Sequence, residues 1–273
     1  MMPSRPPRLR RSAFRFALPP SLGKDAAEGR AARLQEALSK HMERPVEVTV
    51  MSSYAELARE VLGGTSDAAW GPPYVCARLE AMGVRAVARG IRRGSSGYRA
   101  ALVARADAGL ALDSLAGKTA VWVDRESAGG HLLALSLLRA KGLDPAKLFF
   151  AQSFAGSYRA ALEQLLGGRA DVSSVFAHLS EEGTQVLGAE EVLPGSSAQL
   201  SVLALSDEIP NDGVLVAPEA DPGAAFALEQ SLLTLELEDD GAELLKDVFS
   251  VDRFESAPPL GYRALYRVAM ASL

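Results

Sequence analysis

The chain has 273 residues, of which 48% are hydrophobic and 23% are charged. This is the composition of an ordinary globular protein, with enough apolar material for one large or two medium domains. The formal net charge of −5 argues against a nucleic-acid partner, because a phosphate backbone requires a dense face of Lys and Arg. The single cysteine, Cys76, excludes a disulfide within the chain, and the three histidines are too scattered for a zinc site.

The first residues, Met1 to Arg15, are basic and rich in proline. They resemble the n-region of a secretion signal, but the apolar run that follows is short and ends at Pro19, whereas an h-region needs roughly 7–15 apolar residues. No stretch approaches the ~18 apolar residues that span a bilayer. We therefore predict a disordered basic leader over residues 1–13 and no membrane span. The protein would be cytoplasmic as written, or periplasmic if the gene start is truncated.

Strands and helices are predicted to alternate from residue 14 onward. Leu34, Leu38 and Met42 recur on one helical face, and Ser53 followed three residues later by Glu56 has the spacing of a capping box. In the first part of the chain we predict strands at 14–18, 46–51, 68–70, 85–90 and 98–105, and helices at 25–42, 53–62 and 73–82.

The second part of the chain repeats this order. We predict strands at 120–123, 148–151, 172–175, 202–205 and 214–217, and helices at 130–141, 157–166, 224–235 and 241–248, with a last helix after Leu260. Regular alternation of this kind is typical of an α/β protein with mostly parallel sheets and helices on their faces.

An internal echo relates the two parts at a constant offset of 104 residues (157 − 53). The matching pairs are Ser53 and Ser157, Tyr54 and Tyr158, Leu62 and Leu166, Gly63 and Gly167, Gly64 and Gly168, and Asp67 and Asp171. Glycine pairs end many helices, so convergence is the alternative explanation. Six matches in one register favour two similar α/β lobes, with the two aspartates serving the turn before a strand.

Ligands of open α/β sheets bind outside the carboxyl ends of the strands. Helix N-termini there present unpaired N–H groups and a partial positive charge, which suits an anion. Five loops of the sequence fit such a place. They are residues 52–54, 70–74 (WGPPY), 95–98 (SSGY), 124–131 (DRESAGGH) and 154–158 (FAGSY).

Each of these loops also has a purely structural interpretation, which the sequence does not exclude. The run from Ser127 to Gly130 lacks the Lys-Ser/Thr of a Walker loop and the spacing of a dinucleotide fingerprint, so a plain tight turn is the alternative to anion contact. His131 begins a helix, and a buried, hydrogen-bonded structural histidine is favoured over a ligand contact or a base. Trp70 and Tyr74 are either core aromatics or part of a wet cleft.

Several stretches together carry a family resemblance. They are DAAWGPPYV (67–75), SGYRAALVAR (96–105), LDSLAGKTAVWVDRESAGG (112–130), FAGSYRAALEQLLGGRADVSSV (154–175) and IPNDGVLVAP (209–218). In order and spacing they resemble the phosphate/phosphonate-type substrate-binding proteins of ABC importers, over roughly Phe14 to Leu260. The resemblance implies the two-lobed type 2 periplasmic-binding-protein fold (Venus flytrap), in which each lobe is a mixed, mostly parallel sheet flanked by helices. Lobe one would be residues 14–101 plus 205–273 and lobe two residues 102–204, with hinge strands near 100–105 and 202–206.

The resemblance also implies cleft positions, which we combine with the loops above. The candidate ligand-binding residues are Tyr54, Trp70, Tyr74, Tyr98, Ser127, Ala128, Gly129, Gly130, His131, Ser157, Tyr158 and Ser174. The chain departs from phosphonate binders where it has Ala128 and Gly129 in place of hydroxyl residues and Tyr158 in place of a histidine. The acidic residues that would bind the amine of an aminophosphonate are not evident. A carboxylate, a sulfonate or a ligand with an aromatic part is therefore an expected alternative to a phosphonate.

The predicted function is capture of a small anionic ligand, phosphonate-like or another oxyanion, between two lobes that close about a hinge. The partner would be an ABC permease for import, or a signalling protein. The alternative is a cytosolic enzyme of the same fold that acts on a small aromatic carboxylate, as in menaquinone biosynthesis, with His131 or Glu126 as acid or base. No nucleophile–base pair is visible, so we predict no catalytic residue, no cofactor and no metal.

Overall fold

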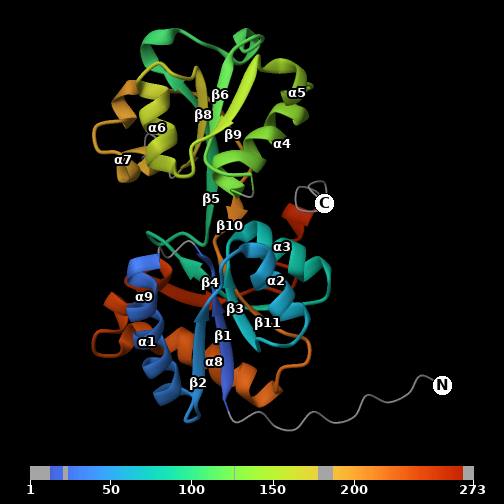
Figure 1. The fold of residues 1–273 in the computed structure, drawn as a ribbon, viewed down its shortest axis with the longest axis vertical. Coiled ribbons are helices and arrows are strands. Elements are labelled where there is room, and N and C mark those ends of the chain that lie inside the picture. The colour runs from blue at the N-terminus through green and yellow to red at the C-terminus, as the bar shows by residue number, and fades with distance from the viewer. Residues whose placement is uncertain (1–12, 21–23, 126, 178–186, 267–273) are drawn as a thin grey trace, which may run out of the picture. The chain divides into compact units, whose positions relative to one another are not determined.

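The computed structural model describes residues 13–20, 24–125, 127–177 and 187–266 (Figure 1). The chain divides into two compact units, which we call unit 1 (Met1–Ser96 with Asn211–Arg263) and unit 2 (Gly97–Pro210 with Ala264–Leu273). The leader expected over residues 1–13 lies, apart from Ala13, outside the described residues. The lobe and hinge bounds expected from the sequence stay predictions.

Unit 1 is built on a six-stranded sheet in the order β12-β4-β11-β3-β1-β2. Strand β1 runs parallel to β2 and β3, whereas β11 is antiparallel to β3 and β4, and β12 is antiparallel to β4. The strands are β1 (Phe14–Leu18), β2 (Val46–Val50), β3 (Ala68–Gly71), β4 (Arg85–Ile91), β11 (Gly213–Val216) and β12 (Arg253–Ser256). The helices are α1 (Lys24–His41), α2 (Tyr54–Leu62), α3 (Pro73–Ala81), α8 (Pro222–Thr234) and α9 (Gly241–Phe249).

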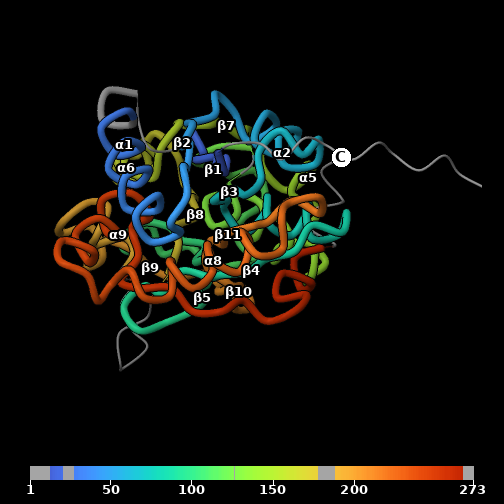
Figure 2. The backbone as a smooth tube through the Cα atoms, turned by 90° about the horizontal axis from the view of Figure 1, so that it is seen from below, coloured from blue at the N-terminus to red at the C-terminus, as the bar shows by residue number. Residues whose placement is uncertain are grey.

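One face of the unit 1 sheet is covered by α1, α8 and α9. The predicted apolar face of α1 is confirmed, because Leu34, Leu38 and Met42 are buried in a core that also holds Phe16 of β1 and Phe249 of α9. Helices α1 and α9 lie side by side in both views (Figures 1 and 2). This packing encloses the apolar side of the sheet.

Unit 2 is built on a sheet in the order β10-β5-β8-β6-β7, with β9 also paired to β5. Strand β6 is parallel to β7 and β8, and β5 is antiparallel to β8, β9 and β10. The strands are β5 (Gly97–Arg105), β6 (Thr119–Trp122), β7 (Ala151–Phe154), β8 (Val172–Ala177), β9 (Leu200–Leu205) and β10 (Ile209–Pro210). The helices are the π-helical turn η4 (Ala128–Leu132), α4 (Leu133–Ala140), α5 (Pro145–Leu148), α6 (Tyr158–Leu166) and α7 (Leu187–Val192).

Side chains of β5 alternate between two cores in unit 2. Val103 packs with Leu162 and Leu165 of α6, whereas Leu102 packs with Leu138 of α4. This is the period of two expected for a strand that is buried on both faces. The mixed α/β architecture predicted from the sequence is confirmed. The expectation that the sheets are mostly parallel is wrong, because among the described strands parallel pairing is limited to β2-β1-β3 and β7-β6-β8, and the other pairs are antiparallel.

The 104-residue echo is a structural repeat that keeps strand register. Arg15 of β1 pairs with Glu47, and Thr119 of β6 pairs with Ala151, so both pairs lie 32 residues apart (47 − 15 and 151 − 119). The helices that follow β2 and β7 begin at serine caps of nearly identical conformation, with φ −155° and ψ 159° at Ser53 and φ −154° and ψ 159° at Ser157. The two units therefore share one βαβ design.

The aspartates of the repeat serve the same purpose in both units. The carboxylate of Asp67 accepts a hydrogen bond from the backbone N–H of Arg15 (2.8 Å), and that of Asp171 accepts one from the N–H of Thr119 (2.8 Å). Each residue lies just before β3 or β8 and is tied to the neighbouring parallel strand, β1 or β6. The turn role predicted for both aspartates thus extends to fixing the start of strand pairing.

The strand predicted at 148–151 is wrong in its position. Asp144 caps the backbone N–H of Ala146 (3.1 Å) and Pro145 stands in the first turn, so residues 145–148 form the short helix α5 and the strand begins only at Ala151. The elements that the sequence did not reveal are α5, α7, β10 and β12. After Leu260 the described residues hold only the 3-10 turn Arg263–Leu265, and residues 267–273 lie outside them.

Mutation of Asp171 tests whether these carboxylate hydrogen bonds to the neighbouring strand stabilise the fold. Its Oδ2 also accepts from the Thr119 hydroxyl (2.8 Å), and these hydrogen bonds hold the pKa of the carboxyl below its ordinary value. We expect Asp171→Ala to lower the free energy of unfolding by about 1–2 kcal/mol at pH 7 in a urea titration. Because the folded pKa is depressed, the difference from wild type should persist above about pH 4 and vanish as the pH falls through the folded pKa.

The matched control is Asp113→Ala, since Asp113 is an exposed carboxylate in a surface turn. It should change the unfolding free energy by less than about 0.5 kcal/mol. Equal losses of unfolding free energy in the two variants would contradict a stabilising role of the Asp171–Thr119 hydrogen bonds.

Candidate functional site

The carboxyl ends of β6, β7 and β8 meet at one edge of the unit 2 sheet, because β6 runs parallel to both neighbours. Strand β5 is antiparallel to β8, with Arg99 opposite Ala177, so the start of β5 at Tyr98 reaches the same edge. The loop after β6 carries Ser127, and the loop after β7 leads to Ser157. The sheet thereby gathers loops distant in the sequence.

The backbone of Gly129 is the point on which these loops converge. A β-carbon at Gly129 would lie 2.9 Å from the hydroxyl oxygen of Tyr158 and 3.1 Å from a ring carbon of Tyr98. It would also lie 3.5 Å from Cβ of Phe176. The first two approaches are closer than ordinary van der Waals contact, so a side chain here would force Tyr158 and Tyr98 to shift, and glycine lets both lie close to the loop.

Ser127 caps the helix that starts in this loop. Its Oγ accepts a hydrogen bond from the N–H of Gly130 (3.1 Å) and lies 3.4 Å from the hydroxyl of Tyr158. Accepting this bond does not use the hydroxyl proton of Ser127, which is left to donate to Tyr158 or to a ligand. The N–H groups of Ala128 and Gly129 precede the first bonds of the helix, so they have no acceptor within it.

A second helix starts at the same edge behind Ser157. The Ser157 Oγ accepts from the N–H of Ala160 (3.2 Å), so this hydroxyl proton is available in the same way. The preceding loop is tied to β6 by hydrogen bonds from the N–H groups of Ala155 to Trp122 (2.8 Å) and Gly156 to Val123 (2.8 Å). Gly156 has a φ of +83°, a conformation that glycine adopts without strain. Two serine-capped helix starts are thus held together.

The charges at the helix starts differ between the units. Neither η4 nor α6 has an acidic residue in its first turn, whereas α2 of unit 1 carries Glu56 there. The Glu56 carboxylate accepts from the N–H of Ser52 (2.7 Å) and from its hydroxyl (2.5 Å), and these bonds lower the pKa of Glu56. Ionised Glu56 offsets the positive end of α2. The partial positive charges at the starts of η4 and α6 are not offset by a first-turn carboxylate, which favours the binding of an anion at unit 2.

His131 is buried below the loop. Its Nδ1 lies 3.0 Å from the carbonyl oxygen of Arg125, and its ring packs edge-on against Phe154 (centroids 5.0 Å apart) and beside Trp122 (5.7 Å). Burial lowers the pKa of His131 below its ordinary value, so the ring is neutral at pH 7. The partner of Nδ1 is a backbone carbonyl, which is the arrangement of a structural histidine. Glu126, the other proposed acid or base, lies outside the described residues.

The aromatic candidates of unit 1 lie in different surroundings. Trp70 is 4% exposed and packs edge-on against Phe249 (5.2 Å) and Phe254 (5.5 Å), so its place is in the core. Tyr74 is buried on α3, whereas Tyr54 is half-buried next to the Ser53 cap of α2. Of the three, Tyr54 is the most exposed, and Trp70 also lines the cavity described below.

Strand β8 supports the Ser127 loop from beneath. The hydroxyl of Ser174 donates a hydrogen bond to the carbonyl oxygen of Gly129 (2.7 Å). Phe176, two residues on and thus on the same face, packs edge-on against Tyr158 (5.1 Å). Sequence reasoning missed Phe176 because the predicted strand, 172–175, ended one residue before it, whereas β8 runs to Ala177. With the longer strand, the spacing of two from Ser174 is the signal that could have found it.

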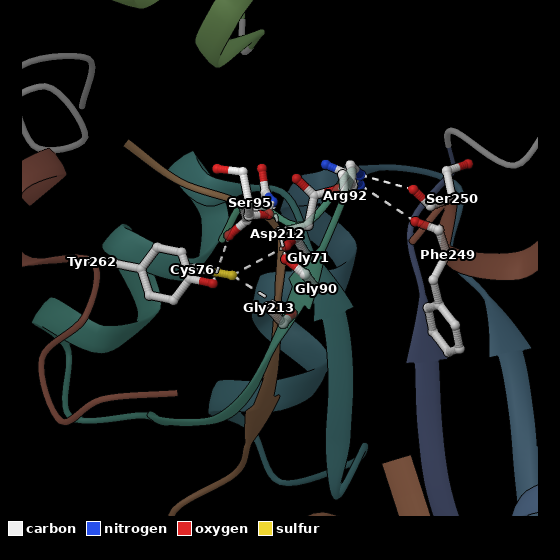
Figure 3. A network of polar contacts seen from close by, with 11 residues as sticks. Gly71, Cys76, Gly90, Arg92, Ser95, Asp212, Gly213, Phe249, Ser250 and Tyr262 are labelled. Atoms are coloured by element: carbon white, nitrogen blue, oxygen red, sulfur yellow. Dashed lines mark hydrogen bonds and ion pairs between the residues drawn. The ribbon is translucent and has the colours of Figure 1, made fainter. Parts of the chain in front are cut away.

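A polar cluster in unit 1 is the other concentration of functional groups (Figure 3). The Arg92 guanidinium donates to the carbonyl of Ser250 (2.9 Å) and to Asp212 (2.8 Å), so it caps the carboxyl end of α9. Cys76 is buried with its thiol toward the carbonyl of Gly71 (3.1 Å), and burial raises its pKa, so it stays a protonated thiol. This cluster stabilises unit 1 and offers no nucleophile.

A cavity of about 330 Å³ borders the cluster. Its two arginines are engaged within unit 1, Arg92 with Asp212 and Arg30 with Asp247 (2.9 Å). Within the described ranges, no three His, Cys, Asp or Glu side chains gather as a metal site. No helix in those ranges is both long and apolar enough to cross a membrane.

Comparison with known proteins decides the family. Residues 16–261 match the model of the periplasmic substrate-binding proteins of phosphonate ABC transporters. The chain belongs to this family. Its members are substrate-binding proteins and not enzymes. The predicted family and binding function are therefore confirmed, and the enzyme alternative is not favoured.

Solved structures agree with this family in fold. The chain is similar to XAC2383 from Xanthomonas citri bound to ATP, with a TM-score of 0.78, 17% identity and coverage of 96% of this chain and 97% of that chain. It is also similar to PhnD1 from Prochlorococcus marinus in complex with methylphosphonate (TM-score 0.74, 16% identity, 95% and 98% covered). A binding-protein component of an ABC phosphonate transporter from Pseudomonas aeruginosa matches with a TM-score of 0.71 and 17% identity (95% and 86% covered). These likenesses confirm the fold class predicted for this phosphonate-binding family member.

The neutral, buried His131 predicts a pH dependence of stability. The unfolded chain binds a proton near pH 6.5, above the depressed folded pKa. The free energy of unfolding should therefore be greatest above pH 6.5 and decline as the pH falls below it. In urea titrations between pH 7.5 and 5, we expect His131→Asn to flatten this decline, because the amide can still donate to the Arg125 carbonyl but does not titrate. An unchanged slope in the variant would exclude His131 as its source.

Proposed function

We propose that this chain binds a small phosphonate-type anion at the Ser127 loop of unit 2 and presents it to an ABC permease. The observation that carries the proposal is the meeting of two serine-capped helix starts, at Ser127 and Ser157, without an acidic residue in either first turn. Their hydroxyl protons and the N–H groups of Ala128 and Gly129 are donors suited to oxyanion oxygens. The Tyr158 hydroxyl, 3.4 Å from Ser127 Oγ, adds a further donor.

The chemistry of the donors supports a phosphonate over an uncharged ligand. Hydroxyl and amide donors at helix starts stabilise a tetrahedral oxyanion by hydrogen bonds and by the helix dipole. Tyr98 and Tyr158, which are half-buried close to Gly129, offer aromatic side chains for contact with the carbon substituent that distinguishes a phosphonate from phosphate. The similarity in fold to a protein solved with methylphosphonate is consistent with this ligand class.

The repeat supports a contribution from unit 1. Tyr54 stands in α2 where Tyr158 stands in α6 (158 − 54 = 104), each directly after a capping serine. We therefore keep Tyr54 as a candidate ligand contact contributed by unit 1. Tyr74, His131 and Trp70 are assigned to packing.

The family also supports the location and the partner. Its members are periplasmic and belong to ABC transporters. Of the two locations that the sequence left open, we propose the periplasm, and of the two partners, we propose the permease. Recovery of the protein in the periplasmic fraction of cells that carry its gene tests the location.

Ligand-dependent stabilisation tests the binding function. At 100 times its dissociation constant, methylphosphonate should stabilise the fold by about 2.7 kcal/mol, which a thermal-shift assay detects readily. Benzoate, offered as an aromatic carboxylate, should give no shift. Ser127→Asp should keep the apo melting temperature, because aspartate is an equally good helix cap, and lose the shift, because its charge repels the anion. A shift of wild-type size in Ser127→Asp would remove the site from this loop.

The first turn of α6 allows a charge test with a neutral twin. Ala160→Glu places a carboxylate where Glu56 stands in α2 (160 − 56 = 104), whereas Ala160→Gln adds the same bulk without charge. We expect the glutamate to raise the Kd for methylphosphonate at least tenfold by calorimetry and the glutamine to change it less than about twofold. The difference should shrink in high salt. Similar values for both variants would exclude the start of α6 from the anion site.

A further inference from the structure

We propose that Ser174 is a positioning residue of the anion site, which acts through the Gly129–Gly130 peptide and not by touching the ligand. This role deepens the proposed function and, in its ligand-binding consequence, rests on it. The sequence placed Ser174 among direct ligand contacts. The hydrogen bond from its hydroxyl to the Gly129 carbonyl indicates a positioning role instead.

The hydroxyl of Ser174 has no proton left for a ligand. The side chain is buried, with 1% of the residue exposed, and its O–H donates to the carbonyl oxygen of Gly129 at 2.7 Å. A serine hydroxyl has a single proton, and the oxygen atoms of a deprotonated anion only accept hydrogen bonds. As long as the bond to Gly129 holds, Ser174 cannot donate to an anion.

The Gly129–Gly130 peptide is held at both ends. Ser174 holds its carbonyl oxygen, and Ser127 Oγ accepts from its N–H at 3.1 Å. The hydroxyl of Tyr158 and the ring edge of Tyr98 approach Gly129 closely, which leaves the peptide plane little freedom to rotate. A buried carbonyl that lost its donor would be costly, so the Ser174 bond fixes the orientation of the peptide.

These bonds form a chain that points in one direction. It runs from the Ser174 O–H to the Gly129 carbonyl, across the peptide to the Gly130 N–H, and from there to Ser127 Oγ. Hydrogen bonds in such a chain polarise one another. Because Ser127 Oγ accepts at its end, the proton of Ser127 is left for another acceptor. The Tyr158 hydroxyl oxygen lies 3.4 Å away, and in the proposed function the bound anion takes this proton instead. Ser174 thus both orients and strengthens the donor.

Ser173 provides a matched control one residue away on β8. Its hydroxyl is also buried, with 0% of the residue exposed, and donates to a backbone carbonyl at the same distance, 2.7 Å to Val121. Val121 lies within β6, away from the Gly129–Gly130 peptide. Adjacent residues of a strand point to opposite faces, so Ser173 cannot replace Ser174 below the loop. Both alanine variants lose one equivalent hydrogen bond, but only one of them releases the loop.

The first experiment measures ligand affinity. Calorimetry with methylphosphonate should show a Kd raised about tenfold in Ser174→Ala and within about twofold of wild type in Ser173→Ala, although both variants should lose similar thermal stability. In the Ser127→Ala background, Ser174→Ala should add less than about twofold, because the two residues act through one chain. Equal affinities of the two single variants, or additive effects in the double variant, would overturn the role.

The second experiment needs no ligand. Hydrogen exchange of the Gly130 amide, followed by NMR in the apo protein, should be about tenfold faster in Ser174→Ala than in wild type and unchanged in Ser173→Ala. An equally slow Gly130 amide in Ser174→Ala would overturn the positioning role. If wild type does not bind methylphosphonate, the proposed function fails, and the exchange rates still decide whether Ser174 holds the loop.

Discussion

Parallel pairing of β6 with both β7 and β8 is the constraint on which the candidate site depends. Parallel strands place their carboxyl ends at one edge, so the helices that follow β6 and β7 both start there. The hydrogen bonds from the 155–156 loop to β6 and from Thr119 to Asp171 keep that pairing in register. Without it, the Ser127 and Ser157 caps would be ordinary helix starts on separate loops.

The repeat shows how one backbone design can serve two electrostatic purposes. The caps at Ser53 and Ser157 have nearly the same dihedral angles, and strand register is conserved across the 104-residue offset. Glu56 fills the first turn of α2 with a carboxylate, and Ala160 leaves the first turn of α6 uncharged. A single side chain thus separates a self-neutralised helix start from one that suits an anion.

Serine residues near the site differ in the direction of their hydrogen bonds. Ser127 and Ser157 accept from backbone N–H groups and keep a proton to donate, whereas Ser174 donates its proton to Gly129. In the proposed function the first two are the ligand contacts. Because Ala128 and Gly129 carry no hydroxyl group, the orientation of the Ser127 and Ser157 hydroxyls matters more.

The sequence by itself determined the local features: helix caps, glycine stops, the apolar face of α1 and the order of strands, because each depends on residues within a few positions of one another. It also indicated the repeat and the Ser127 and Ser157 loops. The tertiary structure decided that Trp70 packs in a core, that Phe176 supports Tyr158, and that Ser174 bonds to Gly129, 45 residues away. Which way a hydroxyl points, and what buries an aromatic ring, depends on strand register between distant segments, and no local pattern encodes that register.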